Sequence, residues 1–531
     1  MTRQKKESNA LVVYDGDSLV IPNKYKKPIQ KSLMAFLDAS STSMGRKTFY
    51  NTKNEQDDAL GKIHKSVFSI NRGLYTSMLL LPGVTDLSRT MGIHCLLQQG
   101  YNNDEEFFLT SDEEKIIINE LLASMPVTRV LRLFEDLKKQ RVNNRRTRTI
   151  ISRFVLGNDN FVFWSVKYRK KIRDMLVHAI GYRQTSALKT ILQKQNVERT
   201  SKERSFIQKS IDRYLPFGIN KKHIYDAICF VLGGTKENWG APLIRSFFEA
   251  RESIEKGKNL PAEVLEGIRS KYHSDVSSAE VMKLTQDNMS EKKKMQVQKS
   301  AKKKNVEIEF NPMKQGVVDL YIHAFETGMT NEIKKALKIK AKKASANNLV
   351  MAHEHVGVVV DCSRSMRGDR TQKHRPISIA LAMRDMLRES ANKATIKSSH
   401  GKTIKNCIPS IQNETSLSQS LVDVLIEKPD TVYLITDGYE NSPAGRVAEV
   451  IKRVREMGNN TPIYQISPVM GAESAGIRSV SSEIEPLPVS RPEGMGLALI
   501  RSAISQGSLE DGIEGLLTIA KKELKRIESK K

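Results

Sequence analysis

Residues 353–366 read HEHVGVVVDCSRSM, and this stretch decides the fold of the C-terminal part of the chain. The apolar run over 356–360 has no alternation of polar and apolar residues, which predicts a strand buried on both faces. A D-x-S-x-S turn follows, in which Asp361, Ser363 and Ser365 put one carboxylate and two hydroxyls on the same side of a loop. Because ligands of open α/β sheets bind beyond the carboxyl ends of the strands, the stretch predicts a ligand site there.

Strands and helices alternate after this stretch. The runs TVYLITD (431–437) and PIYQISPVM (462–470) predict two more buried strands. Helices are predicted at 376–391, 416–426, 446–457 and 507–529. Strands that alternate with helices of ten or more residues are typical of a parallel, doubly wound α/β sheet.

More oxygen ligands are expected at the same sheet edge. Asp437 follows the strand at 431–436 and supplies a second carboxylate, while Thr415 begins a predicted helix and supplies a third hydroxyl. A D-x-S-x-S turn alone also occurs as a helix cap, but the added threonine and aspartate favour a metal site. An all-oxygen site suits one divalent cation, Mg²⁺ first, with Ca²⁺ and Mn²⁺ as alternatives.

These five residues resemble the metal-ion-dependent adhesion site of von Willebrand A domains, whose motif is D-x-S-x-S, then a threonine, then an aspartate at a strand end. The resemblance covers roughly 353–510. It implies a metal with an open coordination position that an acidic group of a partner can fill, and hence a role in binding. The family often has glycine before the second serine. Here it is Arg364, a cation that either weakens metal binding or steers the ligand towards phosphate.

The region from 59 to 350 is predicted to be helical. Ser111 and Glu114 have the spacing of a capping box, and a helix at 223–232 is closed by Gly233. Short helices separated by Pro or Gly favour an α-solenoid of stacked, HEAT-like helical pairs.

These patterns predict that the chain is divided into three parts. Residues 1–58 are expected to form an irregular arm with one short helix at 28–37. Residues 59–350 are expected to form the helical-repeat domain, and 351–531 the metal-binding α/β domain with a C-terminal helix.

The formal net charge is +26, a surplus that attracts polyanions. RNA is the first candidate partner, and an anionic membrane surface is the weaker one. The alternative is a protein that is simply rich in lysine. No membrane span or secretory signal is expected, since no apolar run approaches 18 residues and the N-terminal stretch is polar. The four cysteines lack CxxC spacing, which favours a reducing, cytoplasmic setting without disulfides or structural zinc.

The densest basic stretch is RVNNRRTRTIISRF (141–154), followed by FVFWSVKYRKKIRDMLVHAIG (161–181). Aromatic and basic side chains together suit single-stranded RNA, because cations follow the phosphates while rings and guanidinium planes stack on bases. The alternative is an ordinary amphipathic helix with a solvated basic face.

The segments VKYR (166–169) and RDMLVH (173–178) resemble a signature of the TROVE domain of Ro autoantigen-type proteins, K-Y-R followed by D-L-L-R-L-x-H. In that family a helical-repeat region precedes a von Willebrand A domain, the order expected here over about 60–510. The family's G-W-S-H element between the two segments is missing from this chain. The resemblance implies a ring-shaped scaffold that binds small non-coding RNAs of the Y class on its outer basic surface and single-stranded RNA ends in a central opening.

By residue matching, the resemblance places RNA contacts at Lys167 and His178, with Arg169 and Arg173 as neighbours. The basic stretches add further candidates, namely Lys170, Arg145, Arg146 and Arg148. The sequence thus predicts a non-catalytic, RNA-binding scaffold in a ribonucleoprotein of RNA quality control or processing, with an RNA-processing protein as a further partner. The alternative is a metal-dependent protein-interaction adaptor. An RNA-processing enzyme is disfavoured, because no acid–base or nucleophile set is visible.

Overall fold

The computed structural model describes residues 13–15, 18–43, 52–99, 109–215, 223–236, 238–347, 353–368, 372–399, 408–411, 416–440, 444–468 and 478–529. The chain divides into two compact units. The first, called the α/β unit, combines Met1–Cys95, Tyr101–Ile117 and Pro312–Lys531, and the second, called the helical unit, combines Leu96–Gly100 and Ile118–Asn311. These limits differ from the expected boundaries at 58 and 350, because segments from both sides of those positions pack into the α/β unit.

The α/β unit contains a five-stranded parallel sheet. Its strands are β3 (His353–Val360), β4 (Ala391–Ser398), β5 (Thr431–Ile435), β6 (Ile463–Pro468) and β7 (Pro486–Val489). The order is β4-β3-β5-β6-β7, with every neighbouring pair parallel. The predicted parallel sheet is confirmed. The chain moves outward from β3 in both directions, so the topological switch point lies between β3 and β5, where ligands of open α/β sheets bind.

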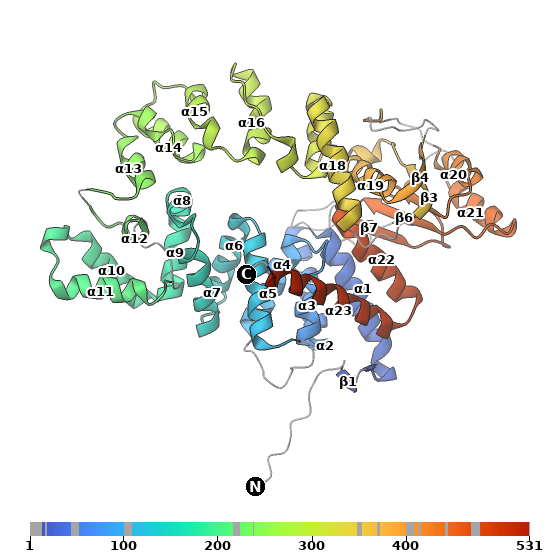
Figure 1. Ribbon diagram of the computed structural model, residues 1–531, viewed down its shortest axis with the longest axis horizontal. Helices are drawn as coiled ribbons and strands as arrows, with labels where there is room; N and C mark the ends of the chain where they lie inside the picture. The colour runs from blue at the N-terminus through green and yellow to red at the C-terminus, as the bar shows by residue number, and fades with distance from the viewer. Residues whose placement is uncertain are drawn as a thin grey trace, which may run out of the picture. The chain divides into compact units, whose positions relative to one another are not determined.

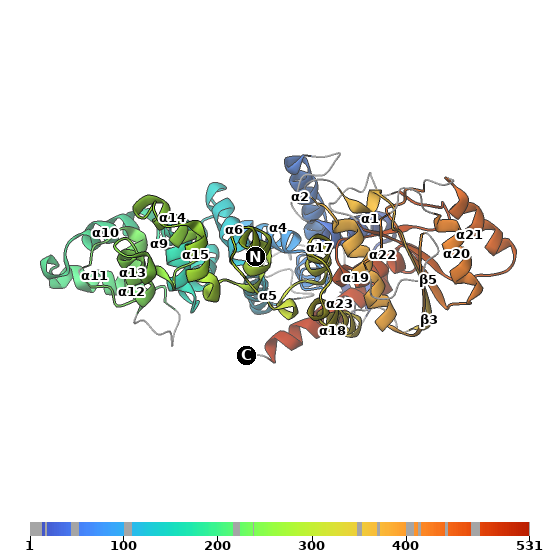
Figure 2. The same ribbon diagram turned by 90° about the horizontal axis from the view of Figure 1, so that it is seen from above.

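Helices cover both faces of this sheet (Figure 2). On one face lie α20 (Leu417–Ile426) and α21 (Arg446–Glu456), whose apolar side chains share one core with the strands. On the other lie α19 (Arg375–Glu389), α22 (Met495–Gln506) and α1 (Asn23–Thr42). The two layers fix the sheet edge on which the predicted metal ligands lie.

Helix α1 lies in the part of the chain that was expected to form an irregular arm. α1 has 20 residues and packs against β7 and α22. Its Leu33 and Phe36 are fully buried, and its Gln30 Nε2 donates a hydrogen bond to the carbonyl oxygen of Ile504 at 2.6 Å. The expected short helix at 28–37 lies within α1, and burial against distant segments extends it to 20 residues. A short antiparallel pair, β1 (Val13–Asp15) and β2 (Ser18–Val20), precedes it.

The other helices around the α/β unit come from both halves of the chain. They are α2 (Lys53–Ile70), α3 (Arg72–Met78), α4 (Asp86–Gln98), α5 (Ser111–Ser124), α17 (Val317–Thr327), α18 (Asn331–Asn347) and α23 (Leu509–Glu528). The last of these is the predicted C-terminal helix, and it packs on α22 and α3.

The N-terminus of α5 differs from the predicted capping box. Thr110 and Glu113 form the reciprocal pair, with the Glu113 amide donating to Thr110 Oγ1 at 3.2 Å. Glu114 instead forms a bidentate ion pair with Arg72, with nitrogen–oxygen distances of 2.8 and 3.0 Å. Both side chains are buried, so this pair joins α3 to α5 inside the α/β unit.

The helical unit consists of short helices packed on their neighbours (Figure 1). They are α6 (Val127–Lys139), α7 (Arg145–Leu156), α8 (Phe161–Lys167), α9 (Arg169–Ile180), α10 (Tyr182–Gln193), α11 (Ser201–Asp212), α12 (Ile224–Leu232), α13 (Pro242–Glu249), α14 (Ala262–Tyr272), α15 (Ser278–Thr285) and α16 (Glu291–Lys303). α9 lies at the centre and packs against α6, α7, α8, α10 and α12. The predicted helical character is confirmed, and the HEAT-like repeat stays a prediction. Within the described part of the chain, no helix is long and apolar enough to cross a membrane.

A buried histidine makes the stability of the α/β unit depend on pH. His64 is fully buried, with Nδ1 2.7 Å from the Tyr75 hydroxyl, and burial lowers the pKa of His64 to about 3. The unfolded chain binds a proton near pH 6.5 and the folded chain does not, so the stability from neutral His64 is lost as the pH falls below 6.5 towards 3.

We expect His64→Gln to remove this contribution, which amounts to a few kcal/mol. The measurement is urea unfolding between pH 4 and 7. His273→Gln is the control, because His273 is only partly buried in the helical unit. An unchanged pH dependence in His64→Gln would contradict the prediction.

Candidate functional site

The D-x-S-x-S turn lies directly beyond β3, as predicted. Asp361 is fully buried and accepts hydrogen bonds from Thr436 Oγ1 at 2.7 Å and from the Ser363 amide at 2.8 Å. The hydroxyls of Ser363 and Ser365 are 2.9 Å apart. Pairing of β3 with β5 therefore brings together oxygen atoms that are about seventy residues apart along the chain.

Asp437 completes this cluster from the end of β5. Its carboxylate accepts a hydrogen bond from Ser365, which opposes the increase in its pKa caused by burial. Burial, and then the charge of Asp437, raise the pKa of Asp361 to about 6. Two carboxylates held this close in a buried site repel each other, and a cation between them would remove the repulsion.

The residues present therefore fit a divalent cation. Asp361, Asp437, Ser363 and Ser365 are brought together, and Thr415 lies outside the described residues. Thr436 is a further hydroxyl at the site, which sequence reasoning missed because it sits at the end of a strand. Among the described residues, no cluster of three or more His, Cys, Asp or Glu side chains suited to a metal occurs.

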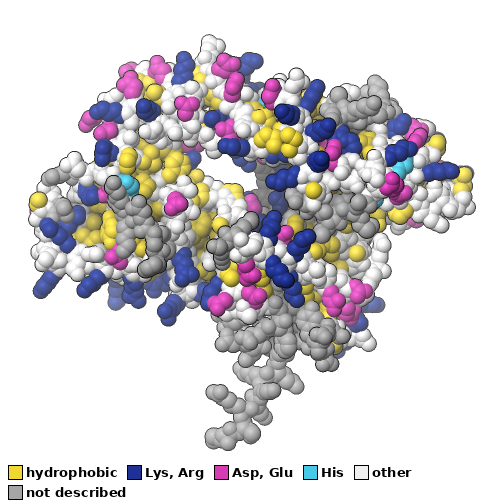
Figure 3. Space-filling model, viewed as in Figure 1, with side chains coloured by type: hydrophobic (Ala, Val, Ile, Leu, Met, Phe, Trp, Pro, Cys, Tyr) yellow, Lys and Arg dark blue, Asp and Glu magenta, His cyan; other side chains and the backbone are white. Residues whose placement is uncertain are grey.

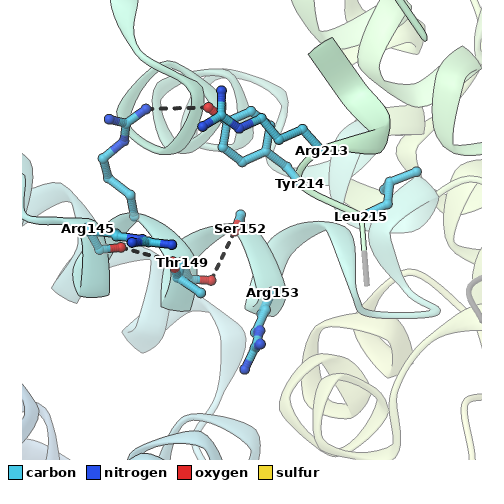
Figure 4. A pocket seen from close by; sticks show the side chains of 8 residues that line it. Arg145, Thr149, Ser152, Arg153, Arg213, Tyr214 and Leu215 are labelled. Atoms are coloured by element: carbon cyan, nitrogen blue, oxygen red, sulfur yellow. Dashed lines mark hydrogen bonds between the residues drawn. The ribbon is translucent and has the colours of Figure 1, made fainter. Parts of the chain in front are cut away.

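A second candidate site lies in the helical unit, where α7 and the end of α11 enclose a cavity of about 760 Å³. The residues that line it are Arg145, Arg148, Thr149, Ser152, Arg153, Arg213, Tyr214 and Leu215. Figure 4 shows the α7 side chains in a row, with Arg213 and Tyr214 across from them. The α7 residues recur every three or four positions, which places them on one face of the helix.

Three of the four cavity arginines are available to a ligand. Arg145, Arg153 and Arg213 are exposed, and none of them forms an ion pair with any residue that the structure describes. Arg148 is committed to the fold, since its guanidinium donates to the carbonyl oxygens of Ala179 and Ile180 at the end of α9. The cavity thus combines unneutralised guanidiniums with a half-buried tyrosine ring.

The surroundings of this cavity are also basic. Figure 3 shows Lys and Arg side chains along the edge formed by α7, α10 and α11. Exposed basic residues on α10 and α11 include Arg183, Lys189, Lys202 and Lys209. A polyanion bound in the cavity would therefore continue over a surface of the same charge.

The residues predicted from the KYR…H resemblance are mostly committed to other contacts. Lys167 Nζ is 3.3 Å from the Glu263 carboxylate. The Arg169 guanidinium donates to the Phe230 carbonyl oxygen and lies 4.0 Å from the centre of that ring. His178 is 6% exposed, and its Nε2 is 3.0 Å from the Val142 carbonyl oxygen. Arg169 and His178 thus contact carbonyl oxygens of neighbouring segments, and their assignment as RNA contacts stays a prediction.

The other basic residues that were predicted to contact RNA differ in their exposure to solvent. Lys170 and Arg173 are exposed on α9, whereas Arg146 is partly buried. Arg153 lies in the basic stretch at 141–154, and its spacing of eight from Arg145 could have identified it. Arg213 carried no such signal, because it lies just after α11, some sixty residues later in the sequence.

No family model and no curated protein match this chain. Among solved structures, the chain is similar to the crystal structure of the Ro (RSR) protein of Deinococcus radiodurans. The sequence identity is 12%, the match covers 90% of this chain and 99% of that chain, and the TM-score is 0.40. A likeness this distant carries no argument about function.

Proposed function

We propose that this chain is a non-catalytic scaffold that binds single-stranded RNA through the α7 cavity. The proposal rests on three exposed arginines on one cavity, Arg145, Arg153 and Arg213, which have no ion-pair partner among the described residues. Each guanidinium can donate two parallel hydrogen bonds to a phosphate, a geometry that lysine does not offer.

The cavity favours a flexible single strand over a duplex. Its walls are concave, and Tyr214 presents an aromatic ring beside the guanidiniums. Unpaired bases can stack on such a ring while the backbone follows the cations, whereas the bases of a duplex are already stacked on each other.

The test is binding of a fluorescent single-stranded RNA to the full chain between 50 and 200 mM salt. If about three phosphates are neutralised, the logarithm of the affinity should fall against the logarithm of the salt concentration with a slope of about −2 or steeper. A tight affinity that does not change over this range would contradict the proposal.

The proposal also covers the class of RNA that is bound. The KYR…H resemblance supports a small non-coding RNA of the Y class, single-stranded ends held in a central opening, and a ribonucleoprotein of RNA quality control that contains an RNA-processing protein. Sequencing of the RNA that copurifies with the native chain tests this part, and recovery of only random fragments would argue against it.

A second function is favoured by the oxygen cluster at the carboxyl ends of β3 and β5. A cation held by Asp361, Ser363, Ser365 and Asp437 would supply an electrophilic position to which a carboxylate of a protein partner can bind. The chain would then act as a metal-dependent adaptor. Recovery of a protein partner that needs both Mg²⁺ and Asp361, with no RNA in the complex, would favour it over the scaffold.

Loss of a carboxylate from this cluster should abolish stabilisation by Mg²⁺. A ligand at ten times its dissociation constant stabilises the folded state by about 1.4 kcal/mol. We expect a higher unfolding temperature of the wild-type chain in Mg²⁺ than in EDTA, and no such difference in Asp437→Asn. Glu456→Gln, an exposed charge loss on α21, is the control and should respond like the wild type. An equal response in Asp437→Asn would exclude a cation at this position.

A further inference from the structure

A second cavity lies in the α/β unit, beside the D-x-S-x-S turn, and has a volume of about 330 Å³. Its lining consists of Phe325, Arg364, Arg367, His374, Ile408, Pro409 and Ile411. Both arginines are exposed, and neither forms an ion pair with a residue in the described ranges. The lining of the cavity therefore combines two cationic side chains with several apolar ones.

His374 is the buried polar group of this cavity. Its side chain is 8% exposed, and its ring is stacked on Phe325 with 4.7 Å between centroids. Its amide donates a hydrogen bond to the Arg367 carbonyl oxygen at 2.6 Å, in a left-handed backbone conformation with φ of 64°. The Nδ1 atom is buried without a hydrogen-bond partner among the described residues, and an orphaned atom of this kind indicates a missing partner.

We propose that this cavity binds the phosphate monoester of a nucleotide, either a free nucleoside monophosphate or the phosphorylated end of an RNA strand. The phosphate would lie between Arg364 and Arg367. The nucleoside would rest on the apolar wall formed by Phe325, Ile408, Pro409 and Ile411.

A phosphate fits these groups better than a carboxylate does. A phosphate monoester carries close to two negative charges and three acceptor oxygens. It can therefore accept hydrogen bonds from both guanidinium groups, whereas a single carboxylate pairs with only one. A cavity of this volume is also within the range of small-molecule sites and is large for a lone acidic side chain.

The position of Arg364 links this cavity to the proposed cation site. It stands between Ser363 and Ser365 in the turn, so a bound phosphate lies at the same sheet edge as the carboxylate pair. Phosphate oxygens are good ligands of Mg²⁺, so the cation and the guanidiniums would attract the same group.

The experiment is calorimetric titration of the full chain, in Mg²⁺ buffer, with 5′-AMP and with adenosine. We expect binding of 5′-AMP, no measurable binding of adenosine, and a loss of affinity of about tenfold or more in Arg367→Ala. Arg364→Ala is the second test variant, and its affinity for 5′-AMP should fall by a similar factor. Lys521→Ala, an exposed charge loss on α23, is the control and should leave the affinity unchanged.

A pair of short RNA oligonucleotides, with a 5′-phosphate or a 5′-hydroxyl, distinguishes the two sources of the phosphate. Tighter binding of the 5′-phosphorylated than of the 5′-hydroxyl oligonucleotide, with the difference lost in Arg367→Ala, assigns the cavity to RNA ends. Equal binding of the two oligonucleotides assigns it to free nucleotides. Equal binding of adenosine and 5′-AMP would overturn the proposal. So would 5′-AMP binding that survives Arg367→Ala but is lost in Arg153→Glu, since the ligand would then occupy the α7 cavity. Preferential binding of an acidic peptide in place of 5′-AMP would also overturn it.

Discussion

Charge reversal at the three available arginines of the α7 cavity should lower the affinity for single-stranded RNA about a hundredfold at moderate salt. The variant combines Arg145→Glu, Arg153→Glu and Arg213→Glu. Each lost contact with a phosphate costs about 1 kcal/mol or more, and three such losses correspond to that factor. The salt dependence should also weaken, with a slope smaller in magnitude by about 2, because three fewer phosphates are neutralised.

The matched control carries the same change in net charge elsewhere on the helical unit. Lys299→Glu, Lys302→Glu and Lys303→Glu replace exposed lysines on α16, outside the α7 cavity. Both triple variants are titrated with the same labelled RNA. Equal losses of affinity would mean that net charge alone attracts the RNA, and the α7 cavity would lose its assigned role.

Glu114→Gln should destabilise the α/β unit by about 3–5 kcal/mol, the usual cost of leaving one charge of a buried ion pair without its partner. Arg72 and Glu114 are 4% and 1% exposed, so solvent cannot replace the lost carboxylate. The pair connects α3 to α5, and its loss should loosen both helices. Urea unfolding followed by fluorescence and by circular dichroism measures the change.

Asp112→Asn is the control for this variant. Asp112 lies two residues earlier, in the first turn of the same helix, and its ion pair with Lys115 is exposed. Its removal should shift the unfolding midpoint only slightly, because exposed ion pairs contribute little. A shift equal to that of Glu114→Gln would show that the charge of the helix start, and not the buried pair, stabilises this region.

Local sequence pattern was sufficient for much of the sheet. Apolar runs without alternation predicted β3, β5 and β6, and the D-x-S-x-S turn predicted where Asp361 would lie. β4 reads ANKATIKS and is only partly buried, so it has no apolar run to reveal it. β7 begins with proline and has four residues, too short for a pattern. Both are edge strands, and each is stabilised by pairing with a single neighbour.

The α7 cavity was harder to predict than the cation cluster. Its cations come from two helices separated by some sixty residues, and no spacing rule connects Arg145 with Arg213. The KYR…H segment attracted attention to His178 and Arg169, yet these side chains hold helices together through the carbonyl oxygens of Val142 and Phe230. Sequence reveals where cations are concentrated, and only the fold shows which of them already have partners.

The contact between α1 and α22 also bears on how the chain is made. At about 5–20 residues per second, a ribosome needs on the order of half a minute to travel from the first of these helices to the second. During that time the face of α1 that carries Gln30 and Asp38 has no α22 to contact, and it is exposed to water or to a chaperone. A nascent chain halted before Met495 should therefore be retained by folding factors, and its release should coincide with the emergence of the last two helices.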